Sequence, residues 1–137
     1  MFEKERVIIE EAWERRELLA EDATREAIRR VVEAVDKGVV RCAEPIDLEN
    51  SKWQVNEWVK KAIIMYFPIQ TMRTMQAGEL EFYDKMELKR GYEELGVRVV
   101  PHAVARYGAY IAPGAILMPS YVNIGAYVDS GTMVDTW

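Results

Sequence analysis

The sequence predicts an α+β fold, in which an α-rich N-terminal part is followed by short β-strands that repeat at a fixed interval. Two observations carry this prediction. Charged residues occur every few positions up to Arg98 and then almost disappear, and from Val104 onward an apolar residue returns every six positions. We therefore expect two architectures, with residues 1–98 forming an α-rich domain and residues 99–137 forming the start of a repetitive β-domain.

The composition is that of a globular protein and disfavours several classes of function. Half of the 137 residues are apolar and 30% are charged, which is enough apolar material for a core. The net charge of −5 disfavours a nucleic-acid partner, because neutralising phosphates requires a basic surface. The single cysteine, Cys42, excludes an intramolecular disulfide, and we expect it to be a small buried apolar residue. We find no cluster of ligands for magnesium or zinc and expect no metal.

The N-terminal segment and the hydropathy predict a cytoplasmic protein. The first residues, MFEKERVIIEEAWERRELL, intersperse charges and lack the uninterrupted apolar region of a signal peptide. No apolar run approaches the ~20 residues that a membrane-spanning helix needs. We therefore expect no membrane partner.

Two amphipathic helices are predicted at the N-terminus. The apolar stripe of the first helix includes Val7, Ile8, Ala12, Leu18 and Leu19. This spacing is that of one helix face. The second helix is expected over residues 24–37, with Asp22 as its candidate N-cap and Gly38 at the C-terminal position that favours glycine.

A short strand, a third helix and less regular elements complete the α-rich part. VVRCAEPI is expected to form a strand, and ENSK a turn. Asn56 is a candidate cap for a helix over residues 57–67, which Pro68 ends. LEFYDKMELKR is expected to be a strand or an extended connection, followed by a helical turn at residues 92–95 and then a strand.

A period of six residues dominates the C-terminal part. The recurring apolar positions are Val104, Tyr110, Ile116, Val122, Val128 and Val134. A second row, two residues later, consists of Ala112, Met118 and Ile124. Six is a multiple of the strand period but not of the helix period, and a fixed repeat is typical of a solenoid. We expect both rows to point inward and the main row to stack from one turn to the next.

Small residues between the apolar positions supply the bends. Glycines recur at Gly108, Gly114, Gly125 and Gly131, and glycine adopts positive φ without a steric penalty. The pattern matches the hexapeptide repeat of left-handed parallel β-helices, in which three hexads close one triangular coil. An antiparallel sheet with glycine-rich turns is the alternative.

These segments resemble one family of enzymes along nearly the whole chain. RVVP, followed by GAYIAPGAILMPSYVNIGAYVDSGTMVDTW, closely resembles the tetrahydrodipicolinate N-succinyltransferases of bacterial lysine biosynthesis. The upstream order of AWERR, TREAI, WVKKAI and FYDK is similar to the same family. Residues 67–79 are the least family-like stretch, and we expect a variable loop there.

The resemblance implies a reaction and an assembly. The family transfers a succinyl group from succinyl-CoA, a co-substrate rather than a permanently bound cofactor, to the amino group of 2-amino-6-oxopimelate. This dicarboxylate is the ring-opened form of tetrahydrodipicolinate. The family forms homotrimers, with active sites in the grooves between neighbouring β-helices.

Two site residues are implied by the family motif. Arg98, in VRVVP, matches the substrate-binding arginine, and Asp135, in MVDTW, matches the substrate-binding aspartate near the acceptor amine. An arginine fork suits a carboxylate, and a carboxylate beside an amine can orient it and take up its proton. An ordinary aspartate is a weak base at neutral pH, so Asp135 would need a raised pKa or would mainly position the ammonium and relay its proton.

Several other residues are weaker candidates. Taken alone, Arg98 would be a surface ion-pair residue and Asp135 a turn-capping carboxylate. His102 is the only histidine, yet it follows Pro101 before the repeats begin, and we expect a structural loop residue there. Tyr83, Asp84 and Lys85 are weak candidates for the acceptor side. We expect Asn123 to stabilise a corner of the coil.

The family resemblance also implies a longer chain with more coils. We therefore expect this sequence to be truncated, to lack the CoA-binding residues, which would lie beyond Trp137, and to have little or no activity alone. Two alternatives remain open: an acetyl-CoA-dependent acyltransferase acting on the same acceptor, and a non-catalytic β-helix trimerisation module.

Overall fold

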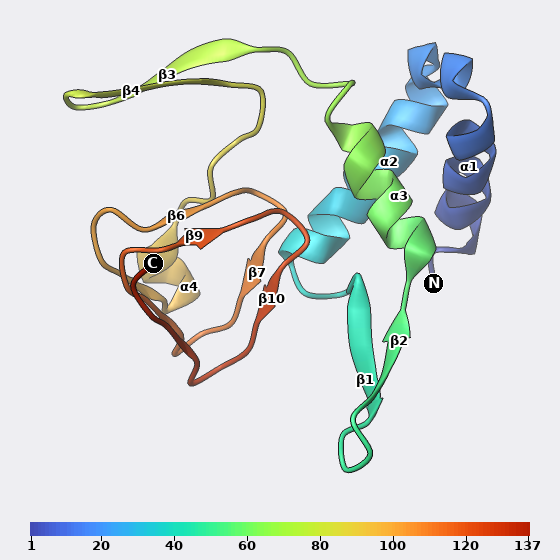
Figure 1. The fold of residues 1–137 in the computed structure, drawn as a ribbon. Helices are drawn as coiled ribbons and strands as arrows, with labels where there is room; N and C mark the ends of the chain where they lie inside the picture. The colour runs from blue at the N-terminus through green and yellow to red at the C-terminus, as the bar shows by residue number, and fades with distance from the viewer.

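The computed structural model describes residues 1–137 and has the expected α+β class, with helices first and short strands after them (Figure 1). The helical elements are α1 (Glu3–Glu14), η1 (Arg16–Ala20), α2 (Asp22–Asp36) and α3 (Glu57–Tyr66). The three predicted helices are confirmed, with two differences. Val7, on the predicted apolar stripe of the first helix, is 65% exposed, and Ile9 is buried instead. The first helical stripe is interrupted at Arg15, whose φ of −126° and ψ of 82° are not helical, and it resumes as the 3₁₀ helix η1.

The ends of α2 show which predicted caps form. Asp22 is the first helical residue and not the N-cap, because the helix begins one residue after the extended Glu21. At the other end Gly38 has φ +72°, as predicted. Its N–H donates to Val35 O at 3.0 Å, and the Val39 N–H donates to Ala34 O at 2.9 Å. These two bonds form a Schellman motif, which satisfies the last carbonyls of the helix.

The three α-helices share one apolar core, which we call the helical core. Its thirteen buried residues are Ile9, Ala12, Ile28, Val31, Val32, Val35, Val59, Ala62, Ile63, Met65, Tyr66, Met86 and Ile124. Leu18 and Leu19 of η1 pack against it, and so does the half-buried Cys42. Burial raises the pKa of the Cys42 thiol, so the side chain remains a neutral packing residue at pH 7.

Two antiparallel hairpins extend from the body (Figure 1). The first pairs β1 (Ala43–Asp47) with β2 (Lys52–Val55), and the second pairs β3 (Arg73–Ala77) with β4 (Leu80–Asp84). The expected strand and turn around β1 and the expected strand β4 are confirmed. β2 and β3 were not predicted. All four residues of β2 and four of the five residues of β3 are exposed, so neither strand has a buried face that a run of apolar residues would mark. The side chain of Asn56 donates to Arg41 O at 2.9 Å instead of capping α3.

The C-terminal part consists of one short helix and seven two-residue strands. They are α4 (Tyr92–Leu95), β5 (Arg98–Val99), β6 (Val104–Ala105), β7 (Tyr110–Ile111), β8 (Ile116–Leu117), β9 (Tyr121–Val122), β10 (Tyr127–Val128) and β11 (Met133–Val134). Each strand pairs in parallel with the third strand after it: β5 with β8, β6 with β9, β7 with β10 and β8 with β11. The antiparallel alternative is therefore wrong.

The register corrects the predicted inward row. Ala105, Ile111 and Leu117 are buried at 1% exposure or less, whereas Val104, Tyr110 and Ile116, one position earlier in each strand, are only partly buried. The stacked interior pairs are therefore Ala105 with Val122, Ile111 with Val128 and Leu117 with Val134. Strand neighbours point to opposite faces, so the first three members of the predicted row lie on the other side of the sheet.

The error has a simple cause in the link between β8 and β9. Inward positions Leu117 and Val122 are separated by five residues, whereas Ala105, Ile111 and Leu117 follow one another at six. A strict count of six therefore passes from outward to inward positions at this link. The second predicted row is also wrong at Ile124, which packs into the helical core and not into the turns of strands.

A close junction joins the helical core to these strands. The Gly108 N–H donates to Asp36 Oδ1 at 2.8 Å, and a Cβ on Gly108 would lie 2.6 Å from Ile124 Cγ1. The ring of Tyr110 lies against Gly38, where a Cβ would come within 2.8 Å. Both glycines have positive φ, which glycine adopts without strain. The close approach of Ile124 to Gly108 and of Tyr110 to Gly38 therefore depends on the absence of a side chain at these two positions.

Candidate functional site

The two residues matched by motif lie at one three-stranded sheet: Arg98 is the first residue of β5, and Asp135 directly follows β11. Its strand order is β11–β8–β5, and Arg98 lies opposite Ile116, which lies opposite Met133. Val99, Leu117 and Val134 form the neighbouring inward row, and Val99 and Val134 pack against the buried Leu117. Asp135 is exposed and directly follows Val134, the last residue of β11.

The geometry of the sheet fixes the approximate separation of the two residues. They lie two strand spacings apart, or roughly 10 Å across the sheet, with Asp135 displaced by two residues along the strand direction. Both are exposed. The Asp135 Oδ1 accepts a hydrogen bond from the Thr136 N–H at 2.8 Å, which holds the carboxylate in place and leaves its other oxygen free. The ion pairs of the molecule do not include Arg98.

His102 lies elsewhere, in the turn between β5 and β6. Its side chain is exposed and makes no hydrogen bond to another residue. The structure therefore gives it no partner that would orient a general base. This is the loop position that the sequence predicts.

The FYDK segment has a structural contact that its sequence does not reveal. Asp84 Oδ2 accepts a hydrogen bond from Arg106 Nη2 at 3.0 Å, and Arg106 Nη1 donates to Asn123 Oδ1 at 3.2 Å. A hydrogen bond from the Lys85 backbone N–H and the charge of Arg106 lower the pKa of Asp84. Tyr83 is 69% exposed. This segment thus ties β4 to the repetitive strands, and Asn123 holds a corner as predicted by also accepting from the Ile124 N–H at 2.9 Å.

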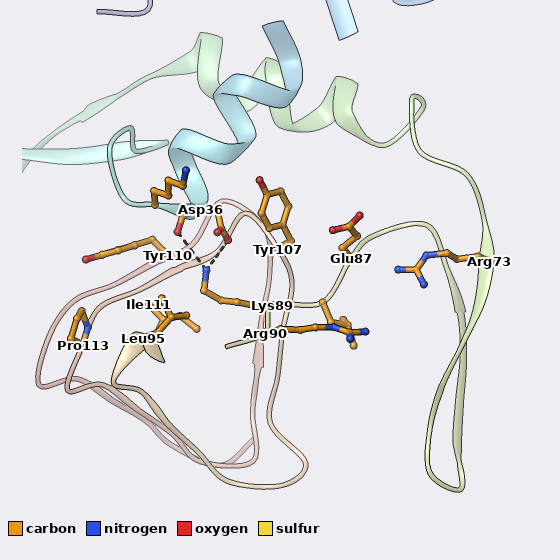
Figure 2. A pocket seen from close by; sticks show the side chains of 12 residues that line it. Asp36, Arg73, Glu87, Lys89, Arg90, Leu95, Tyr107, Tyr110, Ile111 and Pro113 are labelled. Atoms are coloured by element: carbon orange, nitrogen blue, oxygen red, sulfur yellow. Dashed lines mark hydrogen bonds and ion pairs between the residues drawn. The ribbon is translucent and has the colours of Figure 1, made fainter. Parts of the chain in front are cut away.

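The largest open cavity lies between the end of α2, the segment before α4, and β7 (Figure 2). Its volume is about 720 Å³. It is lined by Asp36, Lys37, Arg73, Glu87, Leu88, Lys89, Arg90, Leu95, Tyr107, Tyr110, Ile111 and Pro113. Neither Arg98 nor Asp135 is among them, so this cavity is distinct from the face that carries the motif residues. No local sequence pattern predicts this cavity, because its lining comes from five separate segments.

A buried ion pair forms one wall of the cavity. Lys89 Nζ lies 2.7 Å from Asp36 Oδ1, and the side chain of Lys89 is 5% exposed. Tyr107 stands beside this pair (Figure 2). Burial raises the pKa of Tyr107 to about 12, with smaller contributions from Asp36, Glu33 and Glu87. The Tyr107 hydroxyl is therefore protonated at neutral pH.

No three or more His, Cys, Asp or Glu side chains gather closely enough to hold a metal ion. None of the helices combines the length and the hydropathy that crossing a membrane requires.

Comparison with known proteins gives consistent matches. Residues 5–69 match a family model described as "Tetrahydrodipicolinate N-succinyltransferase N-terminal". A 2,3,4,5-tetrahydropyridine-2,6-dicarboxylate N-succinyltransferase of Coxiella burnetii (strain Dugway 5J108-111) is 46% identical over 120 residues, covering 82% of this chain and 43% of that protein. The protein of that name from Variovorax paradoxus (strain S110) is 46% identical over 140 residues, covering 95% and 50%.

A third relative aligns with all of this chain. The protein of the same name from Polynucleobacter asymbioticus is 45% identical over 148 residues, covering 100% of this chain and 53% of its own. The chain thus spans about half the length of the curated relatives it matches.

Proposed function

We propose, from the premise that this chain belongs to the tetrahydrodipicolinate N-succinyltransferase family, that it is part of an enzyme that transfers succinyl from succinyl-CoA to 2-amino-6-oxopimelate. This acceptor is ring-opened tetrahydrodipicolinate, and the step belongs to diaminopimelate and lysine biosynthesis. The observation that carries the proposal is that Arg98, in β5, and Asp135, directly after β11, stand at the two outer strands of the β11–β8–β5 sheet.

The proposed architecture is a left-handed parallel β-helix over residues 99–137, preceded by an α-rich domain over residues 1–98. The parallel pairing of each strand with the third strand after it supports this assignment. So does the interior row of small residues, in which Ala103, Ala109, Ala115 and Ala126 contribute to one apolar cluster. In such a coil three strands complete one turn, and the interior is filled by side chains stacked between turns.

The proposed chemistry assigns one task to each residue. Arg98 binds a carboxylate of the acceptor through two parallel hydrogen bonds. Asp135, the catalytic residue, holds the acceptor amine and takes up the proton that the amine loses. The amine nitrogen attacks the thioester carbonyl, so that a C–N bond forms and the C–S bond breaks. CoA leaves as the thiolate and recovers a proton. Holding the two reactants together supplies much of the rate.

The proposed assembly is a homotrimer in the cytoplasm, where CoA thioesters are available. Large apolar side chains on the outside of the strands support an interface there, because Tyr121 is 52% exposed and Met133 is 57% exposed. The names of the curated relatives favour a succinyl donor over acetyl and an enzyme over a scaffold module.

The test uses a protein of full family length that contains these residues. Succinyl-CoA and tetrahydrodipicolinate are supplied, and the release of CoA is measured. We expect Arg98→Ala and Asp135→Ala each to lower kcat/KM by roughly 100-fold or more, since each removes a contact to the reacting acceptor.

Two variants serve as matched controls. Asp129 is exposed and accepts the Ser130 N–H at 2.8 Å, which is the geometry of Asp135 and Thr136. Asp129→Ala should therefore leave kcat/KM unchanged, as should Arg6→Ala on the exposed side of α1. If Arg98→Ala and Asp135→Ala retain the rate of the controls, the site assignment is wrong.

A further inference from the structure

The cavity between α2, the segment before α4, and β7 has the features of a small-molecule site (Figure 2). We propose that it binds a small organic dianion, a dicarboxylate or a sugar phosphate, at a place separate from the face of Arg98 and Asp135. A volume of about 720 Å³ lies within the range of metabolite-binding clefts. This proposal stands on the cavity alone and does not depend on the transfer reaction.

The charges in the cavity favour an anion, although the whole chain is acidic. Four cationic and two acidic side chains line it, whereas the net charge of the protein is −5. Asp36 is paired, because its Oδ1 accepts hydrogen bonds from Lys89 Nζ at 2.7 Å and from the Gly108 N–H at 2.8 Å. Asp36 and Lys89 therefore cancel each other, and Asp36 offers little repulsion to a ligand.

Two arginines are left to receive the ligand. Arg73 reaches toward the cavity from β3 and Arg90 from the segment before α4 (Figure 2). Neither takes part in an ion pair of the molecule. A guanidinium presents two parallel N–H donors to a carboxylate or phosphate. Glu87 is the only carboxylate of the lining without an ion-pair partner. Two unpaired guanidinium groups therefore face one unpaired carboxylate.

The remaining walls suit the body of an organic ligand. Leu95, Ile111 and Pro113 provide an apolar surface, which would contact carbon atoms between the anionic groups. The N–H groups of Tyr110 and Ala112 donate to Ala126 O and Val128 O of the adjacent turn. Successive N–H groups along a strand point to opposite edges, so the N–H of Ile111 points to the edge of β7 that no strand covers. It is a further donor for the ligand.

The test is a titration of the 137-residue chain with each probe, in which binding is measured by calorimetry and by amide NMR. The probes are pimelate and ribose 5-phosphate as dianions, with hexanoate as the monoanion of similar length. We expect saturable 1:1 binding of at least one dianion, at least tenfold weaker binding of hexanoate, and shifts of the Gly108 and Ile111 amide signals. The preferred dianion identifies the ligand as a carboxylate or a phosphate compound.

Variants locate the bound ligand. Arg73→Gln and Arg90→Gln should each weaken binding by roughly tenfold or more, because each removes a charge-assisted contact. Arg6→Gln, the same charge change on α1, should bind as the parent does. Arg98→Gln should also bind as the parent does, which separates this cavity from the proposed acceptor site.

Three results would overturn the proposal. The first is the absence of saturable binding by either dianion at millimolar concentration. The second is equal binding of hexanoate and of the preferred dianion. The third is a loss of affinity in Arg98→Gln while Arg73→Gln and Arg90→Gln bind normally. Far-UV circular dichroism confirms the fold of each variant, and exposed arginines tolerate this change.

Discussion

At the scale of single residues, the contact between the helical core and the strands depends on glycine. Gly108 has φ +91°, and its backbone approaches Ile124 and Val32 so closely that a Cβ would lie 2.6 Å and 3.3 Å from their side chains. Both neighbours are buried and have little room to move. Glycine is therefore required at position 108 for two reasons: the backbone has a positive φ, and no space is left for a side chain.

We expect Gly108→Ala to lower the free energy of unfolding by roughly 2–4 kcal/mol, because it combines backbone strain with overpacking. The control is Gly78→Ala in the β3–β4 turn. Gly78 has φ +63° but no atom within 4 Å of the added Cβ, so only backbone strain of about 1 kcal/mol applies. Urea denaturation measures the free energy of unfolding of both variants. Equal losses in Gly108→Ala and Gly78→Ala would contradict the role of the Ile124 contact.

At the scale of elements, the strand register determines which side chains support the coil. Leu117 is fully buried, whereas its neighbour Ile116 is only partly buried on the opposite face. Leu117 lies between Val99 and Val134 in the interior stack. The two residues have the same number of carbon atoms, so they form a matched pair.

We expect Leu117→Ala to cost roughly 2–5 kcal/mol, because it leaves a cavity in the interior stack. Ile116→Ala should cost about 1 kcal/mol, since it removes only partly buried surface. Denaturant unfolding of both variants measures the difference. A larger loss in Ile116→Ala would restore the register that a strict six-residue count predicts.

The sequence was sufficient for the helices and for the repetitive β-part, because both are periodic over many residues. It was insufficient for the register, since a single five-residue link between Leu117 and Val122 moves every later residue by one position. The hairpin strands β2 and β3 were not predicted because their side chains are mostly exposed, so no buried face marks them. Arg98 and Asp135 are predictions from motif, whereas the Asp84–Arg106 contact and the cavity join distant segments that no local pattern links.

At the scale of the whole molecule, the two architectures share packing. Ile124 follows β9 and lies in the helical core, and the Lys89–Asp36 pair joins the end of α2 to the segment before α4. Repeated short strands gain stability from their neighbours, and here the helices act as a neighbour. The helical and strand parts are therefore expected to unfold as one unit.

Native-state hydrogen exchange tests this coupling. We expect the amides of Val32 in α2 and of Ala112 after β7 to exchange with the same free energy of opening. Ile124→Ala should lower both values equally, by roughly 2–4 kcal/mol. If only the protection of Ala112 falls, the strands open independently of the helices.

The parallel pairing of β5, β8 and β11 also has a consequence for how the protein's preference for ligand length could change during evolution. Residues stacked on one outer face are separated by whole multiples of ~4.8 Å, which is the distance between neighbouring paired strands. Duplicating one complete turn between Arg98 and Asp135 would add one such step between them. In the function proposed above, selectivity would then move to a longer acceptor by a discrete increment, without any change in the two side chains proposed to bind it.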